Sequence, residues 1–362
     1  MKKTIVFLKN RNDGSSYYRL YQYLKDKNNC RFIDITSTTI YRWFYNGSGK
    51  GILIKKMIMA AESILRVYAG IILDMLFWKS DIVIVNRKFF ARKVPAFGLI
   101  ILKTYLKNKT VYWDFDDNII YDGEITLGEA VLLQKYSKSI SVTNSFLKES
   151  LDQIYHNKIE LLSTTDITFI DWNMEFITRM RLDKYQKKIK LIWLGTKNNL
   201  KYLENILPRL EECAIDCKKK FNKKLELTVV CNKFVEQVFE NLVINNIRWN
   251  RDSALHELMN AHIGLMPLIE DTYTIGKGGF KAIQYIGAGL PALISNVGYN
   301  PYVINLHCGF LIDYESQWNE SILFLANNED MWKSYSYEAR KNWQKSFSPE
   351  FHYKYWSNKC AR

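Results

Sequence analysis

The chain has 362 residues, which is more than one ordinary domain contains and suits two. Hydrophobic residues make up 48% and charged residues 24%, so a packed core is expected and a largely disordered protein is excluded. The formal net charge of +14 favours anionic partners such as phosphates, anionic lipid or nucleic acid.

The cysteines indicate neither a metal site nor a disulfide framework. Only Cys213 and Cys217 lie close together, and no histidine follows them at ligand spacing. Reduced thiols in a cytoplasmic protein are therefore expected.

Two apolar stretches need to be weighed as membrane or targeting segments. The run at 4–8 is too short for the core of a signal peptide and predicts a β-strand. Segment 57–78 is the stronger candidate for a transmembrane helix, but Glu62, Arg66 and Asp74 interrupt it. We expect an amphipathic or buried helix there, at most in contact with a membrane surface.

The first half alternates short apolar runs with helical patterns. Helices are predicted at 15–26 and 94–107, and the polar segment 169–188 is interpreted as a connection between domains. Strand–helix alternation predicts a parallel, doubly wound sheet. The predicted strands are 4–9, 30–35, 81–86, 110–117, 139–144 and 159–164.

The second half repeats this alternation. Helices are predicted at 200–219, with a break at Pro208, and at 235–242, 254–261 and 330–362. Strands are predicted at 190–195, 225–232, 246–250, 262–268 and 291–295. Two Rossmann-like halves in tandem fit this pattern. We expect an N-terminal domain at 1–180, a second domain at 181–340, and a C-terminal helix at 341–362 that packs back on the first domain.

Residues 276–295 read GKGGFKAIQYIGAGLPALIS. Their glycines precede a helix predicted from about 280 to 288, so backbone N–H groups and the positive end of the helix dipole are accessible to an anion. Lys277 and Lys281 add positive charge at the same end. The arrangement suits a nucleotide diphosphate, and the alternative is a glycine-rich turn with two surface lysines. The patterns of a dinucleotide site and of a P-loop are both absent.

The run KGGFKAIQYIGAGLPALISNVGYNPYVI resembles the signature of glycosyltransferase family 4, the retaining sugar transferases of GT-B architecture. The resemblance is strongest over about 190–312. It implies an α/β fold with two Rossmann-like domains, whose parallel sheets face a central cleft. In that family two glutamates separated by seven residues flank the helix, whereas this chain has Gly276 and Gln284 at the two positions.

The resemblance also implies where a nucleotide sugar binds. Gln284 replaces the residue that holds the ribose, and as a neutral donor and acceptor it can keep that role. Ribose and base contacts are expected from Gln284, Trp249 and Asn250. Contacts to the donor diphosphate are expected from Gly195, Thr196, Lys197, Lys201, Lys277, Gly278, Gly279, Phe280 and Lys281.

The acceptor side is expected in the first half, where residues 12–20 resemble the polar loop of the family. The acceptor-side candidates there are Ser15, Ser16, Tyr17 and Arg19. Asp114, Asp116 and Asp117 end a predicted strand, where doubly wound sheets bind ligands. Strand alternation predicts Asp114 and Asp116 on one face and Asp117 on the other. Asp116 and Asp117 are the catalytic candidates, and the alternative is a solvated turn that caps the next helix.

The resemblance implies a hexosyltransferase-like enzyme that moves sugar from a nucleoside-diphosphate sugar to a glycan or lipid-linked saccharide, with retention, in surface polysaccharide synthesis. The nucleotide sugar is a co-substrate, and neither a cofactor nor a metal is expected. A cytoplasmic location is expected, with peripheral contact at the inner face of the membrane. No nucleic acid is expected, because basic residues are not interleaved with aromatic ones on a recognisable module.

Two alternatives stay open. A nucleotide-sugar epimerase of the same fold would need catalytic acids and a histidine. His262 is more readily explained as a structural residue, so the Asp cluster at 114–117 is the only feature here that resembles such a catalytic site. A catalytically silent partner subunit is consistent with the two missing glutamates.

Overall fold

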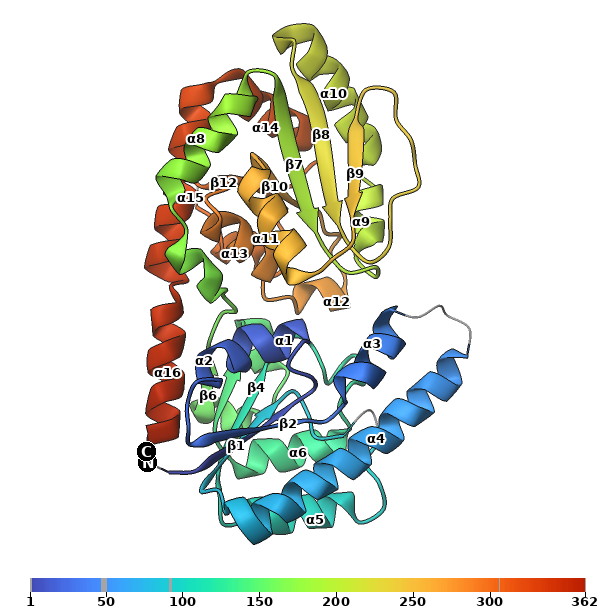
Figure 1. Ribbon diagram of the computed structural model, residues 1–362, viewed down its shortest axis with the longest axis vertical. Coiled ribbons are helices and arrows are strands. Elements are labelled where there is room, and N and C mark those ends of the chain that lie inside the picture. The colour runs from blue at the N-terminus through green and yellow to red at the C-terminus, as the bar shows by residue number, and fades with distance from the viewer. Residues whose placement is uncertain (1, 47–50, 91–92, 306, 362) are drawn as a thin grey trace. The chain divides into compact units, whose positions relative to one another are not determined.

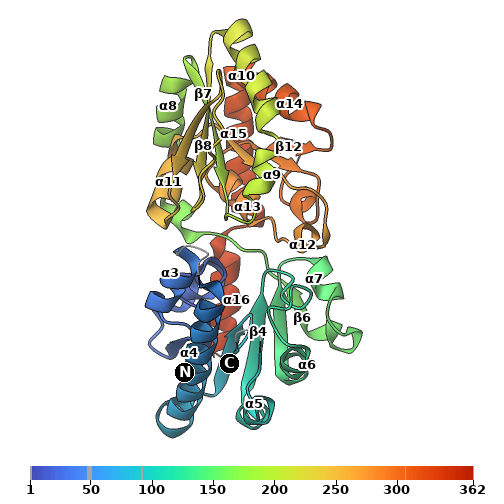
Figure 2. The same cartoon turned by 90° about the vertical axis from the view of Figure 1, so that its right-hand side faces the viewer.

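The computed structural model describes residues 2–46, 51–90, 93–305 and 307–361. Contacts divide the chain into two compact units, which Figures 1 and 2 show from two directions. The first unit is Met1–Thr164 with Gly276–Gly278 and Pro349–Arg362, and the second is Thr165–Ile275 with Gly279–Ser348. The predicted domain boundaries at 180 and 340 stay predictions.

The first unit is built on a six-stranded sheet in the order β2-β1-β3-β4-β5-β6, in which every neighbouring pair is parallel. The central strands are fully buried, because helices cover both faces of the sheet. The strand order reverses between β1 and β3, and sheets of this kind bind ligands beyond the carboxyl ends at such a reversal. The strands are β1 (Thr4–Leu8), β2 (Cys30–Asp34), β3 (Ile82–Asn86), β4 (Thr110–Phe115), β5 (Ser137–Val142) and β6 (Ile159–Leu161).

Three helices of this unit connect successive parallel strands of the sheet. These are α4, α5 and α6, and all three share one apolar core on one face of the sheet. The first helical segment begins at Gly14, because the Asp13 side chain accepts from Ser16 N and is the N-cap. The helices are α1 (Gly14–Ser16), η1 (Tyr17–Tyr21), α2 (Gln22–Leu24), α3 (Thr38–Asn46), α4 (Ile52–Leu73), η2 (Asp74–Trp78), α5 (Gly98–Leu106), α6 (Leu127–Tyr136), α7 (Ser145–Glu149), η3 (Gln153–Lys158) and α16 (Pro349–Ala361).

The second unit also has six parallel strands, in the order β12-β11-β10-β7-β8-β9. Counted from β9, this is the doubly wound order 3-2-1-4-5-6, with its reversal between β7 and β10. The predicted fold class, α/β with two Rossmann-like parallel sheets, is therefore confirmed. The strands are β7 (Lys188–Leu194), β8 (Lys224–Val230), β9 (Val243–Ile247), β10 (Ile263–Met266), β11 (Ala292–Ser295) and β12 (Gly309–Ile312).

The helices of the second unit confirm one detailed prediction. The predicted break at Pro208 lies between α9 and α10, where Pro208 occupies the first turn of the second helix. The helices are η4 (Ile167–Asp171), α8 (Met174–Tyr185), α9 (Leu200–Glu204), α10 (Leu207–Phe221), α11 (Arg251–Asn260), α12 (Thr272–Ile275), α13 (Phe280–Gly287), η5 (Asn300–Tyr302), α14 (Ser316–Asn327) and α15 (Glu329–Ser346).

Two predictions for the second half are wrong. Residues 235–242 form no helix, because Asn246 of β9 binds both the N–H and the carbonyl of Val235 and holds the segment in an irregular path. Residues 169–188 are not a simple connection, since they contain α8. That helix is anchored by Arg181, which is fully buried and donates hydrogen bonds to the carbonyls of Leu258, Ala288 and Gly289.

His262 has a structural role, as predicted. Its side chain is fully buried, its Nδ1 accepts from Lys190 N at 2.9 Å, and its Nε2 lies 3.0 Å from the carbonyl of Arg181. Burial lowers the pKa of His262 to about 3, so the ring is neutral and joins α8 to β7 and β10.

Candidate functional site

Charged side chains gather beyond the carboxyl ends of β3 and β4 in the first unit. The Arg87 guanidinium donates to Asp116 Oδ1 from Nη2 at 2.7 Å and from Nε at 3.1 Å. The same guanidinium binds Asp117 through Nη2 and Glu124 Oε2 through Nη1 at 3.1 Å. Ser15 Oγ donates to Asp116 Oδ1 at 2.6 Å. We call Ser15, Arg87, Asp116, Asp117 and Glu124 the Arg87 cluster.

The prediction that Asp117 faces away from Asp116 is wrong. The strand β4 ends at Phe115, so the alternation of side chains stops before the two acids, and one Arg87 nitrogen binds both. Burial raises the pKa of Asp116, Arg87 acts in the opposite direction, and the charge of Asp117 adds to the rise. Burial also acts to raise the pKa of Glu124, but Arg87 and Lys88 outweigh it and lower that pKa. Of the two acids, Asp116 is therefore the one that is protonated more readily, and Glu124 the one that stays ionised.

Arg19, a predicted acceptor-side residue, is used inside the fold. Its side chain is fully buried and forms a two-pronged ion pair with Asp114, with Nη2–Oδ1 at 2.6 Å and Nε–Oδ2 at 2.8 Å. Ser16 is also fully buried, and its Oγ donates to Asn86 Oδ1 at 2.9 Å. Tyr17 is half-buried and packs edge-on against the ring of Tyr18. Of the four acceptor-side candidates, the structure brings Ser15 into the Arg87 cluster.

Sequence reasoning missed Arg87 and Glu124. Arg87 follows the buried strand β3 directly, which was the available signal for a residue at the carboxyl edge of the sheet. Its backbone has φ of 64°, a left-handed conformation that is uncommon for a side chain of this size and occurs often at functional sites. The turn is supported by Glu129, whose Oε1 accepts from Phe89 N at 2.5 Å and from Phe90 N at 3.4 Å.

The predicted glycine loop leads into α13 of the second unit, as expected. Gly279 is the N-cap of α13. The position requires glycine for two reasons: its φ is 65°, and a Cβ there would lie 2.7 Å from Val303 Cγ2. Lys281 lies in the first turn, and its Nζ donates to Gln284 Oε1 at 3.0 Å. The ammonium also lies 5.0 Å from the ring centroid of Phe280. Phe280 and Lys281 on the first turn of α13 thus form one connected group with Gln284 on the second turn.

Asp166 is a buried acid of the second unit that sequence reasoning missed, and it caps η4. Its Oδ1 accepts from Thr168 N at 3.0 Å and from Thr168 Oγ1 at 2.7 Å. Burial raises the pKa of Asp166, and the hydrogen bonds from Thr168 oppose the rise. The Gln284 amide is oriented by the hydrogen bond that its Oε1 accepts from Lys281.

Tyr285 fixes the geometry where the strand order reverses. Its hydroxyl accepts from Leu194 N of β7 at 2.9 Å and donates to the Leu265 carbonyl of β10 at 3.0 Å. The ring lies over Gly264, where a Cβ would come within 2.3 Å of the ring carbon Cγ. The tyrosine therefore bridges the two strands directly before Gly195, which begins the predicted diphosphate loop.

The remaining donor-side candidates fall into different environments. Thr196, Lys197 and Lys201 are exposed after β7, and the Lys201 ammonium lies 4.8 Å from the Tyr202 ring centroid. Gly195 leaves room for the Trp193 ring, which a Cβ would approach to 2.1 Å.

Trp249 and Asn250, which were expected to bind the base, have structural roles. Asn250 caps α11, and its side chain accepts from Ser253 N in a capping box. Trp249 is half-buried against the core of the second unit. By their contacts, Lys277 and Gly278 belong to the first unit.

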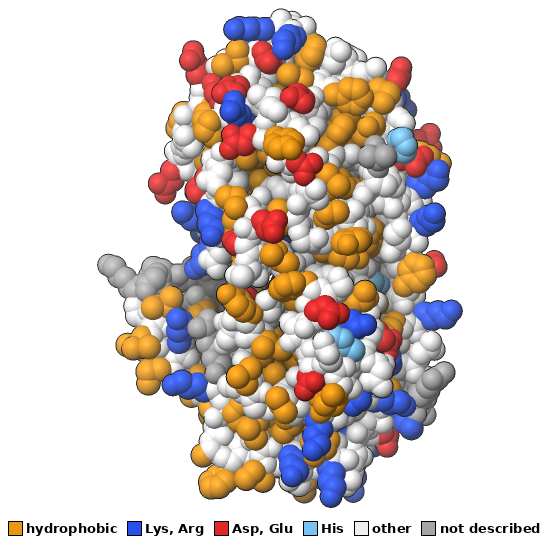
Figure 3. All heavy atoms as spheres, turned by 180° about the vertical axis from the view of Figure 1, so that it is seen from behind, with side chains coloured by type: hydrophobic (Ala, Val, Ile, Leu, Met, Phe, Trp, Pro, Cys, Tyr) orange, Lys and Arg blue, Asp and Glu red, His pale blue; other side chains and the backbone are white. Residues whose placement is uncertain are grey.

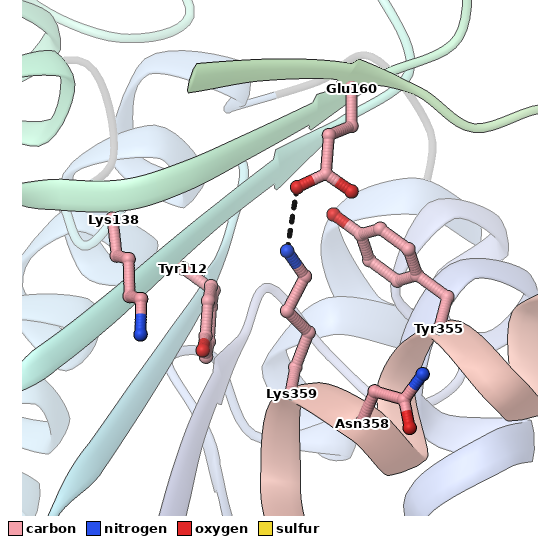
Figure 4. Close-up of a pocket in the computed structure, with 6 residues that line it drawn as sticks. All are labelled: Tyr112, Lys138, Glu160, Tyr355, Asn358 and Lys359. Carbon is pink, nitrogen blue, oxygen red and sulfur yellow. Dashed lines mark hydrogen bonds and ion pairs between the residues drawn. The ribbon is translucent and has the colours of Figure 1, made fainter. Parts of the chain in front are cut away.

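A hollow in the first unit lies where α16 meets the sheet, and Figure 4 shows its lining. Lys359 Nζ donates to Glu160 Oε1 at 2.6 Å and lies 5.1 Å and 4.8 Å from the ring centroids of Tyr112 and Tyr355. These contacts fasten α16 to β4 and β6, so we assign them a structural role. The lining residues are Tyr112, Lys138, Glu160, Tyr355, Asn358 and Lys359.

No protein-family model matches the chain, and no curated protein matches it. Solved structures do match it. HepE of Anabaena, in complex with UDP and glucose, superposes with a TM-score of 0.66 at 9% identity over 100% of both chains. A glycosyltransferase from Rickettsia africae gives a TM-score of 0.59 at 14% identity over 98% of this chain and 96% of that chain. Sucrose-phosphate synthase from Thermosynechococcus elongatus gives 0.59 at 10% identity over 99% and 98%. At these identities the likeness shows the fold, which is the two-domain α/β fold of GT-B type.

Proposed function

We propose that the chain is a glycosyltransferase that takes its sugar from a nucleoside-diphosphate sugar. The observation that carries the proposal is the glycine-capped first turn of α13, with Lys281 and Gln284 joined to each other next to the strand reversal of a doubly wound sheet. A helix N-terminus of this kind binds phosphate through backbone N–H groups and the helix dipole. The HepE structures of the same fold contain UDP with glucose and UDP-glucose, which supports a uridine nucleotide as the first donor to test.

The chemistry asked of this turn is to stabilise the negative charge that develops on the leaving diphosphate. Preorganised amides at Gly279 and Phe280 and the ammonium of Lys281 would do so without the help of a metal ion. Lys277, Gly278, Lys197 and Lys201 would add to this stabilisation. Gln284 would hold the ribose hydroxyls, because the hydrogen bond from Lys281 orients its amide.

The Arg87 cluster would serve the acceptor. Asp116, with its raised pKa, would accept a hydrogen bond or a proton from the acceptor hydroxyl, and Ser15 and Arg87 would hold its carboxylate in place. The proposal further includes retention of configuration, a hexose as the sugar and a glycan or lipid-linked saccharide as the acceptor, in surface polysaccharide synthesis in the cytoplasm. These finer features rest on the signature-like run at residues 277–304.

Calorimetric titration with UDP, GDP, ADP and CMP, first without metal and then with magnesium, tests the donor site. We expect selective binding of one diphosphate without metal, and weaker binding by Lys281→Ala. Lys341→Ala removes an equal charge from α15 and is the matched control. Equal affinity in both variants would contradict the assignment of α13. A folded protein that binds none of the nucleotides would instead favour the silent partner subunit.

A further inference from the structure

The outer layer of the first unit is unusually apolar. The helices α4 and α5 pack on the sheet through buried residues such as Val67, Ile71 and Leu102, yet their opposite sides carry large hydrophobic side chains. Leu65 and Phe77 are each 70% exposed and Phe97 is 75% exposed. We call this surface the α4–α5 face. Its exposed hydrophobic residues are Ile52, Leu53, Ile54, Met57, Ile58, Leu65, Ile72, Leu73, Met75, Leu76, Phe77, Phe97, Leu99, Ile100 and Ile101.

The helix α4 is apolar on two sides, since Val67 and Ile71 are buried in the core while Leu65 and Ile72 are exposed. Glu62 Oε2 accepts from Ser37 N at 3.1 Å, and Arg66 Nε donates to the Asp34 carbonyl at 2.6 Å. Glu62 is half-buried, whereas Arg66 binds the backbone through Nε and stays exposed. A surface helix normally carries polar residues on the side away from the core. On α4 that side is largely apolar, which leaves apolar area for a partner.

Asp74 at the end of α4 follows the same rule. It is buried, and its carboxylate accepts from Ser80 N at 2.9 Å, from Tyr105 OH at 2.7 Å and from Lys109 Nζ at 2.8 Å. Each of the three side chains that interrupt the apolar run in the sequence thus has a hydrogen-bond partner within the first unit. No helix in the described part of the chain is long and apolar enough to cross a membrane, so the face suits a surface-bound rather than a spanning geometry.

The charges around the face decide which partner it fits. The acids in 51–109 are Glu62 and Asp74, which bind inwards, and Asp81, whose Oδ2 accepts from Lys3 N at 3.0 Å. The exposed basic side chains of this segment include Lys56, Lys79, Lys93, Lys103 and Lys107. Figure 1 shows α4 on the side of the first unit nearest the viewer, and Figure 3, seen from behind, shows hydrophobic and basic side chains next to each other on the lower part of the opposite side. A second copy of the chain would bring these lysines against one another, whereas anionic lipid headgroups would pair with them.

We propose that the α4–α5 face is a docking surface for anionic membranes. Its apolar side chains enter the boundary between headgroups and acyl chains, and its lysines contact the headgroups. The inference goes beyond the proposed donor chemistry and does not depend on it, since it uses residues of the first unit outside the Arg87 cluster.

Flotation of the full chain with vesicles tests the proposal. Phosphatidylcholine vesicles are compared with vesicles of phosphatidylcholine and phosphatidylglycerol, and we expect binding to the anionic ones. The triple variant Lys56→Gln, Lys103→Gln, Lys107→Gln should bind at least about tenfold more weakly. Its matched control, Lys218→Gln, Lys219→Gln, Lys224→Gln, removes the same charge from the second unit and should bind like the parent.

The apolar contribution has its own pair of variants. Leu65→Gln with Phe77→Gln should weaken binding, whereas Val238→Gln with Tyr314→Gln should not, although Val238 is 90% and Tyr314 73% exposed in the second unit. These exposed substitutions leave the fold intact, which circular dichroism checks. The proposal would be overturned if the parent protein did not bind anionic vesicles. It would also be overturned if variants of the α4–α5 face and their control variants bound the vesicles equally well. A third result would also overturn it. If the parent protein bound no vesicles but formed concentration-dependent dimers in ultracentrifugation, and the Leu65 and Phe77 double variant did not form them, the face would bind a second copy of the chain.

Discussion

The buried ion pair of Arg19 and Asp114 allows a test of whether Arg19 stabilises the folded protein or is available to bind a ligand. Both side chains have no exposed surface, and the pair is joined by two hydrogen bonds of 2.6 Å and 2.8 Å. Asp114 also accepts from Ser141 Oγ at 2.6 Å and from Asn86 Nδ2 at 3.2 Å. Each charge is thus compensated inside the protein rather than by water.

Removing one partner leaves the other charge buried and uncompensated. From this geometry we expect Arg19→Met and Asp114→Asn each to lower the free energy of unfolding by about 3–5 kcal/mol. The double variant should lose much less than the sum of the two single losses, because the second substitution removes a charge that the first one left unpaired. Urea unfolding of the four proteins, followed by circular dichroism, gives all three values.

The control is Arg209→Met, which removes exposed ion pairs with Glu212 at 2.8 Å and Glu315 at 3.4 Å and should leave stability nearly unchanged. Single losses below about 1 kcal/mol, or strictly additive losses, would refute the reasoning. Arg19 would then be as available for a ligand as its place in the sequence suggested.

Three further predictions follow from single contacts. Burial raises the pKa of Glu129 from 4.5 to about 7, so between these pH values the folded protein holds a proton that the unfolded chain has lost. Stability should therefore fall by up to about 3 kcal/mol as pH rises through this window, and urea unfolding of Glu129→Gln should show a flatter pH profile. Gly264→Ala should cost about 1–3 kcal/mol because its Cβ would meet the Tyr285 ring, whereas Gly14→Ala, with nothing within 4 Å, should be nearly neutral in the same assay. Asp116→Asn should keep the calorimetric affinity for the donor diphosphate and lose sugar transfer by about 100-fold or more; loss of donor affinity instead would contradict its place on the acceptor side.

Most strands could be predicted because their sequence pattern is local. Runs such as Ile82–Asn86 and Lys188–Leu194 are rich in β-branched and apolar residues and are bounded by polar turns, so the buried parallel strands are visible without any tertiary information. The helix α8 could not be predicted, because the contacts that stabilise it are not local in the sequence. Its buried side is held by Arg181, a charged residue whose burial depends on carbonyls that are distant in the sequence.

The candidate site divides in the same way. The glycine-capped start of α13 could be predicted, because Gly278, Gly279 and Lys281 are neighbours in the chain. The Arg87 cluster could be predicted only in part, since Asp116 is visible at the end of a strand but its partner comes from the preceding strand. Arg19 and Arg87 are chemically equivalent in the sequence. What separates them is that Arg19 lies against a fully buried acid, whereas Arg87 lies at the open end of the sheet among acids that are partly exposed.

The helix α4 shows why composition alone misleads about surfaces. In the sequence, Glu62, Arg66 and Asp74 argue against a spanning helix, and the structure agrees. Their effect on the fold is nevertheless different from that of ordinary solvent-exposed charges, because backbone groups and side chains of the first unit satisfy them. A hydropathy profile assigns each residue a value but no direction, so it cannot show that Glu62 and Asp74 bind within the first unit while Leu65 and Phe77 are exposed. With these two acids bound inside the unit, the outer side of the segment is largely apolar, and the membrane test therefore addresses Leu65 and Phe77 rather than the acids.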